Sequence, residues 1–236
     1  MHIFYTTQIQ NDHAILDAGE SHHCVKVLRL TNGDAVQLID GNGGFYDAVI
    51  EKADHRQCLL KITGVRKDFE KRNYHIHIAM APTKNIDRFE WFVEKCTEIG
   101  IDEITPILCE HSERKILKPE RVQRVIVSAV KQSLKAYIPV LNPLQSFTEF
   151  IENNTASTRK FIAHCYDEPK EKIADSIHPG ESILIMIGPE GDFSGEEVDR
   201  ALNMGFHGLS LGNSRLRTET AGVVACHSVY FINQQS

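Results

Sequence analysis

Residues 211–221 read LGNSRLRTETA, a polar loop between two apolar segments. The apolar stretch before it, from Gly208 to Leu211, is typical of a short strand. The stretch after it, from Ala221 to Phe231, is typical of a helix. In such a unit the loop that follows the strand is a usual place to hold a small ligand. The sequence therefore predicts a binding site at residues 211–221, called the Leu211 loop below.

A second loop with two glycines, the Gly188 loop, covers residues 188–194 and reads GPEGDFS. It lacks the GK[ST] ending of a phosphate-binding loop and the GxGxxG pattern of a dinucleotide-binding loop. Gly188 and Gly191 permit close approach of the backbone to a flat ligand, and Glu190 opposes a phosphate but tolerates a cation. A cofactor with an adenosine and a sulfonium therefore fits better than a dinucleotide. A tight turn before a capped helix is the alternative, and it is the favoured interpretation when this loop is taken alone.

The chain from residue 74 onward alternates predicted strands and helices. Strands are expected at 74–81, 103–109, 161–165, 183–187 and 207–211, and helices at 87–99, 119–134, 194–204 and 221–231. This alternation predicts an α/β class, with a parallel sheet covered on both faces. Since ligands bind beyond the carboxyl ends of parallel strands, the segment with His164 and Cys165 should meet the two loops there.

The first part of the chain has a different pattern. Strands are expected at 36–39, 45–50 and 58–65 and one helix at 20–30, which together suit a small β-barrel. The charged stretch 66–72 has few apolar residues and reads as a linker. We therefore expect two domains, at residues 1–70 and 73–236.

Composition places the chain among globular proteins, with 42% hydrophobic and 25% charged residues. The longest apolar run, 183–187, is too short to span a bilayer, and the first residues do not resemble a signal peptide, so we expect a cytoplasmic protein with no membrane partner.

None of the six cysteines forms a CxxC pair. Free buried thiols are therefore expected, with no metal site and no disulfide framework.

Charge is unevenly distributed along the chain. The net charge of −6 argues mildly against a nucleic-acid partner. Residues 111–137, however, contain seven Lys or Arg and two acidic residues. Such a segment either binds phosphates or is a solvated helix face, and composition does not choose between the two.

Taken together, the Gly188 and Leu211 loops resemble the cofactor loops of the SPOUT knotted methyltransferases. The resemblance is to the family that methylates N3 of a uridine in 16S ribosomal RNA, and it extends over the whole chain. It is carried outside the loops by His22-His23, residues 27–30, Gly33-Asp34, Lys84, Arg88, Glu94-Lys95, residues 98–100, Pro106, residues 112–114 and residues 131–133. Two departures occur: Asp192 stands where a second glycine is usual, and Asn213-Ser214 replace a pair that commonly contains proline.

The resemblance implies a SPOUT domain with a parallel sheet and a deep trefoil knot, preceded by a PUA-like RNA-binding β-barrel. It implies a homodimer that uses S-adenosylmethionine to methylate a decoding-region uridine in the assembled 30S subunit. Two alternatives remain at this point. One is a SPOUT methyltransferase that acts on another atom, such as a ribose 2′-hydroxyl, and the other is a non-catalytic RNA-binding relative.

The resemblance also implies roles for particular residues. The loop residues expected to bind the cofactor are Gly188, Pro189, Glu190, Gly191, Leu211, Gly212, Leu216, Arg217 and Thr218. The residues expected to contact RNA are His22, His23, Arg29, Lys84, Arg88, Arg114 and Lys131.

Methylation at N3 requires removal of the N3 proton and stabilisation of negative charge on the uracil oxygens. A fixed cation performs the second task, and Arg217 is the candidate because it lies just before the last predicted helix. Glu219 is expected to orient Arg217 or to assist proton removal, and Thr218 to cap the helix. Trp91, between Glu90 and Phe92, is interpreted as a packing or dimer contact rather than a base-stacking surface.

Overall fold

The computed structural model describes residues 2–154 and 159–234, and it divides into two compact units. The N-terminal unit comprises the chain up to Lys71 together with Val127–Ile138. The C-terminal unit comprises Arg72–Ile126 and the chain from Pro139 onward. Helix α3, Pro119–Gln132, contributes residues to both units.

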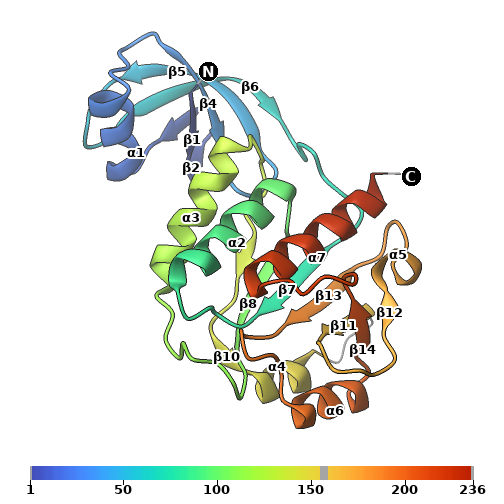
Figure 1. Cartoon of the computed structure of the whole chain (residues 1–236). Coiled ribbons are helices and arrows are strands. Elements are labelled where there is room, and N and C mark those ends of the chain that lie inside the picture. Colours follow the sequence, from blue (N-terminus) through green and yellow to red (C-terminus); the bar gives the residue numbers. More distant parts are fainter. Residues whose placement is uncertain (1, 155–158, 235–236) are drawn as a thin grey trace. The chain divides into compact units, whose positions relative to one another are not determined.

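The N-terminal unit is built on a curled six-stranded sheet with the order β1-β4-β5-β6-β3-β2 (Figure 1). Strand β1 pairs parallel with β4, and the other neighbours pair antiparallel. Buried side chains that include Phe4, Leu38 and Leu60 fill the inside of the curl. The strands are β1 Ile3–Tyr5, β2 Gln8–Gln10, β3 His13–Ile15, β4 Ala35–Ile39, β5 Phe45–Lys52 and β6 Leu59–Arg66.

The helical segment of this unit differs from the expected helix at 20–30. It consists of α1, Ala18–His22, followed by the π-helical turn η1, His23–Val27. Asp17 starts α1, because its carboxylate accepts the backbone N–H of Glu20 at 2.8 Å. The segment ends before residue 30, since Arg29 takes a left-handed conformation with φ of 58° that a helix cannot contain.

The C-terminal unit is built on an eight-stranded sheet, in which every pairing of named strands is parallel, as the alternating pattern predicts. Its strands run in the order β10-β8-β7-β13-β11-β14-β12, with β9 pairing β8. Their bounds are β7 Ile76–Met80, β8 Glu103–Leu108, β9 Val140–Leu141, β10 Gln145–Ser146, β11 Arg159–Ala163, β12 Glu171–Lys172, β13 Ile183–Ile187 and β14 His207–Ser210.

Helices cover both faces of this sheet, with α2 and α7 on one side and α4 and α6 on the other (Figure 1). Apart from α3, they are α2 Ile86–Ile99, α4 Phe147–Asn153, α5 Ile173–Ser176, α6 Gly195–Asn203 and α7 Thr218–Asn233. Local sequence sets several ends: Ser194 and Glu197 form a capping box at the start of α6, and Gly100 ends α2 with φ of 116°.

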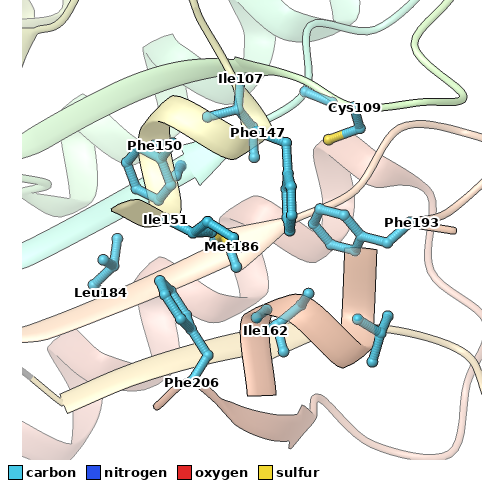
Figure 2. Packing of buried hydrophobic residues seen from close by; sticks show 14 residues of the cluster. Ile107, Cys109, Phe147, Phe150, Ile151, Ile162, Leu184, Met186, Phe193 and Phe206 are labelled. Carbon is cyan, nitrogen blue, oxygen red and sulfur yellow. The ribbon is translucent and has the colours of Figure 1, made fainter. Parts of the chain in front are cut away.

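The core on the α4 and α6 side reaches directly beneath the Gly188 loop (Figure 2). Phe193 of that loop is completely buried and packs against Phe147 of α4, with ring centroids 5.8 Å apart. Met186 of β13 and Ile107 of β8 belong to the same cluster. The loop is therefore anchored in the core by its own aromatic side chain.

Helices α2 and α7 pack closely on the other face. A Cβ atom at Gly222 would lie 2.6 Å from the ring of Phe92, so the contact requires glycine.

All six cysteines are free, as expected; five are buried and Cys165 is exposed. Within residues 2–154 and 159–234, no helix is long and apolar enough to cross a membrane, and no group of three metal-binding side chains is present.

Candidate active site

Three segments of the C-terminal unit meet where β11, β13 and β14 end, at the expected edge of the sheet. The Gly188 loop, the Leu211 loop and residues 163–165 line two overlapping hollows of about 400 and 470 Å³. The two hollows share Ala163, Cys165, Arg215, Leu216 and Ala221, and together they form one space, the loop cavity. Its size suits a small-molecule ligand.

Every residue predicted to hold the cofactor lines this loop cavity. Residues 163–165 and the Gly188 loop supply His164, Cys165, Gly188, Pro189, Glu190 and Gly191, and the Leu211 loop supplies Leu211, Gly212, Leu216, Arg217 and Thr218. The structure adds Lys170, Arg215 and Ala221 to the lining. No sequence motif marks Lys170 as a lining residue. Its ammonium donates to the carbonyls of His164 and Tyr166, at 3.1 and 2.6 Å, and these contacts hold it beside the cavity.

Asp192 holds the Gly188 loop in place. Its backbone has φ of 64°, the left-handed conformation that glycine adopts readily, which explains why glycine is usual at this position. Its carboxylate accepts the backbone N–H of Cys165 at 2.7 Å and that of Phe193 at 2.8 Å. The side chain therefore ties the loop to the end of β11, a link that glycine cannot make.

Further contacts fix the same loop. The hydroxyl of Tyr166 donates to the carbonyl of Phe193 at 2.9 Å, and the His111 ring lies 3.1 Å from the carbonyl of Asp192. A Cβ atom at Gly191 would lie 3.0 Å from the Cβ of His111. The missing side chain of this glycine thus allows the loop to pack against its own protein.

Glu190 is held from the opposite side by the segment after β7. Its carboxylate accepts the backbone N–H of Lys84 at 2.9 Å. Arg114 in turn donates to the carbonyls of Thr83 and Lys84, at 3.0 and 2.6 Å. The ammonium of Lys84 pairs with Glu113 at 2.7 Å, and this hydrogen bond raises the pKa of Lys84. Both Lys84 and Arg114, predicted RNA contacts, therefore already have protein partners.

The Leu211 loop is held much more loosely. Residues 212–215 and Arg217 are exposed. Gly212 has φ of 116°, and its N–H lies 3.4 Å from the hydroxyl of Ser210. Among residues 2–154 and 159–234, neither Arg215 nor Arg217 forms an ion pair, so two cations face the loop cavity without a partner.

The start of α7 differs from the prediction. Arg217 occupies the N-cap position without a side-chain cap, and Thr218, expected as the cap, is the first helical residue and is buried. The expectation that Thr218 caps the helix is therefore wrong. A capping threonine has to occupy the N-cap position itself, and here the hydroxyl stands one residue beyond it.

In the described part of the chain Glu219 forms no ion pair with Arg217, the contact by which it would orient that side chain. It is 6% exposed, and its one ion pair in the described chain joins its Oε1 to Nε of Arg88 at 3.8 Å. Its Oε2 atom is buried without a hydrogen-bond partner. Local sequence patterns cannot reveal this contact, because Arg88 lies on α2 and Glu219 on α7, far apart in the chain.

A third hollow of about 300 Å³ adjoins the loop cavity between the starts of α2 and α7. Arg88 and Arg217 line both spaces. The hollow is called the helix cavity, and it is completed by Asp87, Trp91, Glu219 and Thr220.

His164 is the buried titratable group of the loop cavity. It is 7% exposed, and neither ring nitrogen has a hydrogen-bond partner. Burial lowers its pKa, and the charge of Lys170 lowers it further. The ring is therefore neutral at neutral pH and presents one donor and one acceptor.

The other predicted RNA contacts lie apart in the chain. His22, His23 and Arg29 are exposed on the N-terminal unit. Lys131 belongs to the same unit and pairs with Glu20 at 2.6 Å. Arg88 lies on the C-terminal unit, where it borders both cavities.

Two family models match the chain. The RNA methyltransferase domain covers residues 70–230, and the RNA methyltransferase PUA domain covers residues 16–63. The chain belongs to this family of RNA methyltransferases. The two loops of the cavity fall within the first match, and the second contains α1, η1, β4, β5 and part of β6 of the N-terminal unit.

Relatives of this methyltransferase match it over most of its length. Ribosomal RNA small subunit methyltransferase E of Synechocystis is 30% identical over 220 residues, which are 89% of this chain and 70% of that protein. A probable rRNA-methyltransferase of Porphyromonas gingivalis is 42% identical, with a TM-score of 0.90 over 100% of this chain and 99% of that one.

A solved structure with a bound ligand is also similar. Ribosomal RNA small subunit methyltransferase E of Neisseria gonorrhoeae, bound to S-adenosyl methionine, is 25% identical. It has a TM-score of 0.89 and covers 98% of this chain and 97% of its own.

Proposed function

We propose that this chain transfers the methyl group of S-adenosylmethionine to N3 of a uridine in the 16S rRNA of the small ribosomal subunit. The observation that carries the proposal is the loop cavity itself, in which two family loops meet beside the unpaired Arg217. The names of the relatives support the substrate class, and the ligand of the Neisseria protein supports the cofactor.

The chemistry of the loop cavity fits this cofactor. Glu190 and Asp192 line the space and favour a sulfonium cation over a phosphate. The unpartnered ring of His164 and the backbone of the Gly188 and Leu211 loops offer hydrogen bonds to an adenosine. The eleven lining residues predicted from the sequence would hold the cofactor, Arg217 through its backbone alone, and the cofactor would supply an electrophilic methyl carbon.

The residues beside the cavity suit the remaining chemistry. As N3 bonds to the methyl carbon and the carbon–sulfur bond breaks, the N3 proton must leave, and Glu219 is the buried carboxylate placed to accept it. Arg217, exposed and without an ion pair in the described chain, stabilises the negative charge that gathers on the uracil oxygens. The thioether product is neutral, and the proton passes from Glu219 to water.

The remaining parts of the proposal concern RNA and assembly. Residues 1–70 form a PUA-like RNA-binding domain in which His22, His23 and Arg29 contact RNA. Further along the chain, the residues that add RNA contacts are Lys84, Arg88, Arg114 and Lys131. Residues 73–236 form the SPOUT domain with its deep trefoil knot. The target lies in the decoding region of an assembled 30S subunit in the cytoplasm. The chain acts as a homodimer, as the family resemblance implies.

Two measurements test this function. Calorimetric titration with S-adenosylmethionine should show one saturable site per chain, lost when Gly188 is replaced by a bulky residue that meets Phe193. Incubation with unmethylated 30S subunits, followed by mass mapping, should then place one methyl group on a uracil base. A methyl group on a ribose would overturn the proposed target atom, and cofactor binding without any transfer would leave an RNA-binding relative.

A further inference from the structure

We infer that the helix cavity receives the extruded target uracil, with Trp91 as the stacking surface and Glu219 as the group that distinguishes uracil from cytosine. The inference rests on the proposed function and names the site of the substrate base. It assigns Trp91 a role different from the packing or dimer contact that the sequence favours.

The position of the helix cavity is the first argument. A methyl carbon and the atom that attacks it must come within roughly 3.5 Å of each other before transfer. The base therefore has to lie in a space that opens directly beside the cofactor. The helix cavity meets this requirement, because the side chains of Arg88 and Arg217 border both it and the loop cavity.

The exposure of Trp91 is the second argument. Its neighbours Phe89 and Phe92 are completely buried, whereas Trp91 is 42% exposed and lines the helix cavity. An extruded base presents a flat apolar face, and stacking on an indole covers both surfaces. Arg88, which lines the same cavity, adds a cation that can engage a carbonyl oxygen or a phosphate of the nucleotide.

The unsatisfied oxygen of Glu219 is the third argument. A buried carboxylate oxygen without a donor is costly, and such atoms in native proteins call for a partner. The N3–H of uracil is a donor, whereas N3 of cytosine is an acceptor that a carboxylate repels. The same atom thus reads the base and receives the proton whose removal the reaction requires.

Arg88 controls access to that oxygen. It is half-exposed, and its 3.8 Å contact with Glu219 is its one side-chain interaction in the described chain. Asp87, by contrast, is engaged by Arg121 at 3.0 Å. A base that enters the cavity therefore displaces Arg88 from Glu219 without breaking a hydrogen bond, and frees Arg88 to face the nucleotide.

The experiment compares Trp91→Phe and Trp91→Ala on unmethylated 30S subunits. Trp91→Ala should lower kcat/KM by roughly tenfold to a hundredfold, as expected for the loss of one base–aromatic stack, while Trp91→Phe stays within about threefold of the wild type because it keeps a ring. Affinity for S-adenosylmethionine should not change in either variant. The control is Leu202→Ala, which truncates an exposed apolar side chain on α6 and should leave all values unchanged.

Three results would overturn the role of Trp91: full activity of Trp91→Ala, equal impairment of Trp91→Phe and Trp91→Ala, or a change in oligomeric mass by light scattering in Trp91→Ala. The last result would show a contact with a partner subunit instead of a base.

Glu219 is tested by exchanging the base. Target RNA fragments that carry cytosine in place of the target uracil should bind the wild type more weakly, by roughly tenfold, because a buried acceptor then faces an acceptor. In Glu219→Gln this preference should fall to about twofold, since an amide offers both a donor and an acceptor. If Glu219→Gln keeps the wild-type preference for uracil over cytosine, Glu219 does not distinguish the two bases.

A direct readout separates this inference from the proposed function. Trp91 is the single tryptophan of the chain, so its fluorescence reports on this cavity alone. Fragments that contain the target uridine should quench it saturably, and cytidine fragments should quench it less. Methyl transfer to the uracil of these same fragments without such quenching would overturn the inference alone. Quenching by the uridine fragment without methylation of uracil would overturn the proposed reaction while supporting the base site.

Discussion

The Gly188 loop and the Leu211 loop line the same cavity but are held in opposite ways. In the Gly188 loop, the carboxylate of Asp192 binds two backbone N–H groups, Phe193 is buried in the core, and Glu190 binds the backbone of Lys84. In the Leu211 loop, Arg215 and Arg217 are exposed and have no ion pair in the described chain. The Gly188 loop thus forms a side of the cavity that is ordered before ligand binds, called the wall below, and the Leu211 loop contributes two unpaired cations.

The difference follows from what each side has to do. A wall that holds a cofactor gains from being ordered beforehand, because ordering after binding opposes affinity. A cation that stabilises developing charge must keep its hydrogen-bond donors free for the substrate. The comparison therefore predicts that variants of the Gly188 loop affect cofactor affinity, whereas side-chain variants at Arg217 in the Leu211 loop affect turnover.

Arg217→Ala provides the strongest test of this division. Turnover on 30S subunits should fall by roughly a hundredfold or more, as for the loss of an oxyanion-stabilising donor. The calorimetric affinity for S-adenosylmethionine should stay within about threefold, since the exposed guanidinium has no structural partner in the described chain whose loss would disturb the cavity.

Arg215→Ala is the matched control, because Arg215 is an equally exposed and unpaired cation of the same loop. Its turnover should fall far less than that of Arg217→Ala. Equal losses in both variants would show that the loop contributes only a general positive charge.

Asp192→Ala tests the wall and should have the second-largest effect. The variant loses a charged acceptor of two backbone N–H groups and places alanine at φ of 64°. Affinity for S-adenosylmethionine should therefore fall by roughly tenfold or more, since hydrogen bonds to charged groups contribute about 1.5–3 kcal/mol each. Turnover at saturating cofactor should change little.

Two further substitutions separate the causes. Asp192→Asn keeps an acceptor and tolerates the left-handed backbone, so it should bind better than alanine. Asp192→Gly removes the backbone strain but does not restore the link to Cys165. If the Asp192→Gly variant binds the cofactor as tightly as the wild type does, the link between the Asp192 carboxylate and Cys165 contributes nothing to cofactor affinity.

Much of the fold is visible in local sequence, because its signals act over a few residues. The capping box Ser194–Glu197 and the terminal Gly100 stand where the pattern places them. The short strands β1 to β3 were not predicted, since three residues carry too little periodicity. The helix α4 was also missed, although Ser146 and Glu149 form a capping box there.

The site shows where local sequence stops being informative. The residues that line the loop cavity follow from the loops, which are continuous in sequence. The pairing of Glu219 with Arg88, the support of Lys84 by Arg114 and the tie between Asp192 and Cys165 join segments far apart in the chain. No local pattern encodes these contacts, because they depend on how the sheet brings its strand ends together.

Gly222→Ala tests whether the packing of α7 on α2 positions the Leu211 loop, since α7 begins directly after this loop. The added methyl group would collide with Phe92 of α2, and overpacking of this kind costs about 1–3 kcal/mol. The melting temperature should therefore fall by several degrees, and kcat should fall with it as Arg217 is displaced. Gly195→Ala is the control, because its Cβ would meet no atom within 4 Å.

His164 gives the smallest expected effect, a pH dependence of cofactor binding. Its pKa is lowered, first by burial and then by Lys170, while Asp192 and Glu168 oppose the shift. The unfolded chain therefore takes up this proton more readily than the native one, so stability is complete above about pH 6.5 and declines as the pH falls below it. Protonation also places a positive charge beside the site of a sulfonium cation.

Affinity for S-adenosylmethionine should therefore weaken as the pH falls from about 6.5 to 5, by less than roughly tenfold. His164→Asn keeps one donor and one acceptor but cannot take up a proton in this range. Calorimetry across this range should show that the pH dependence disappears in His164→Asn. If the variant keeps the full pH dependence, the titrating group lies elsewhere, and His164 contributes to the cavity only as a buried lining residue.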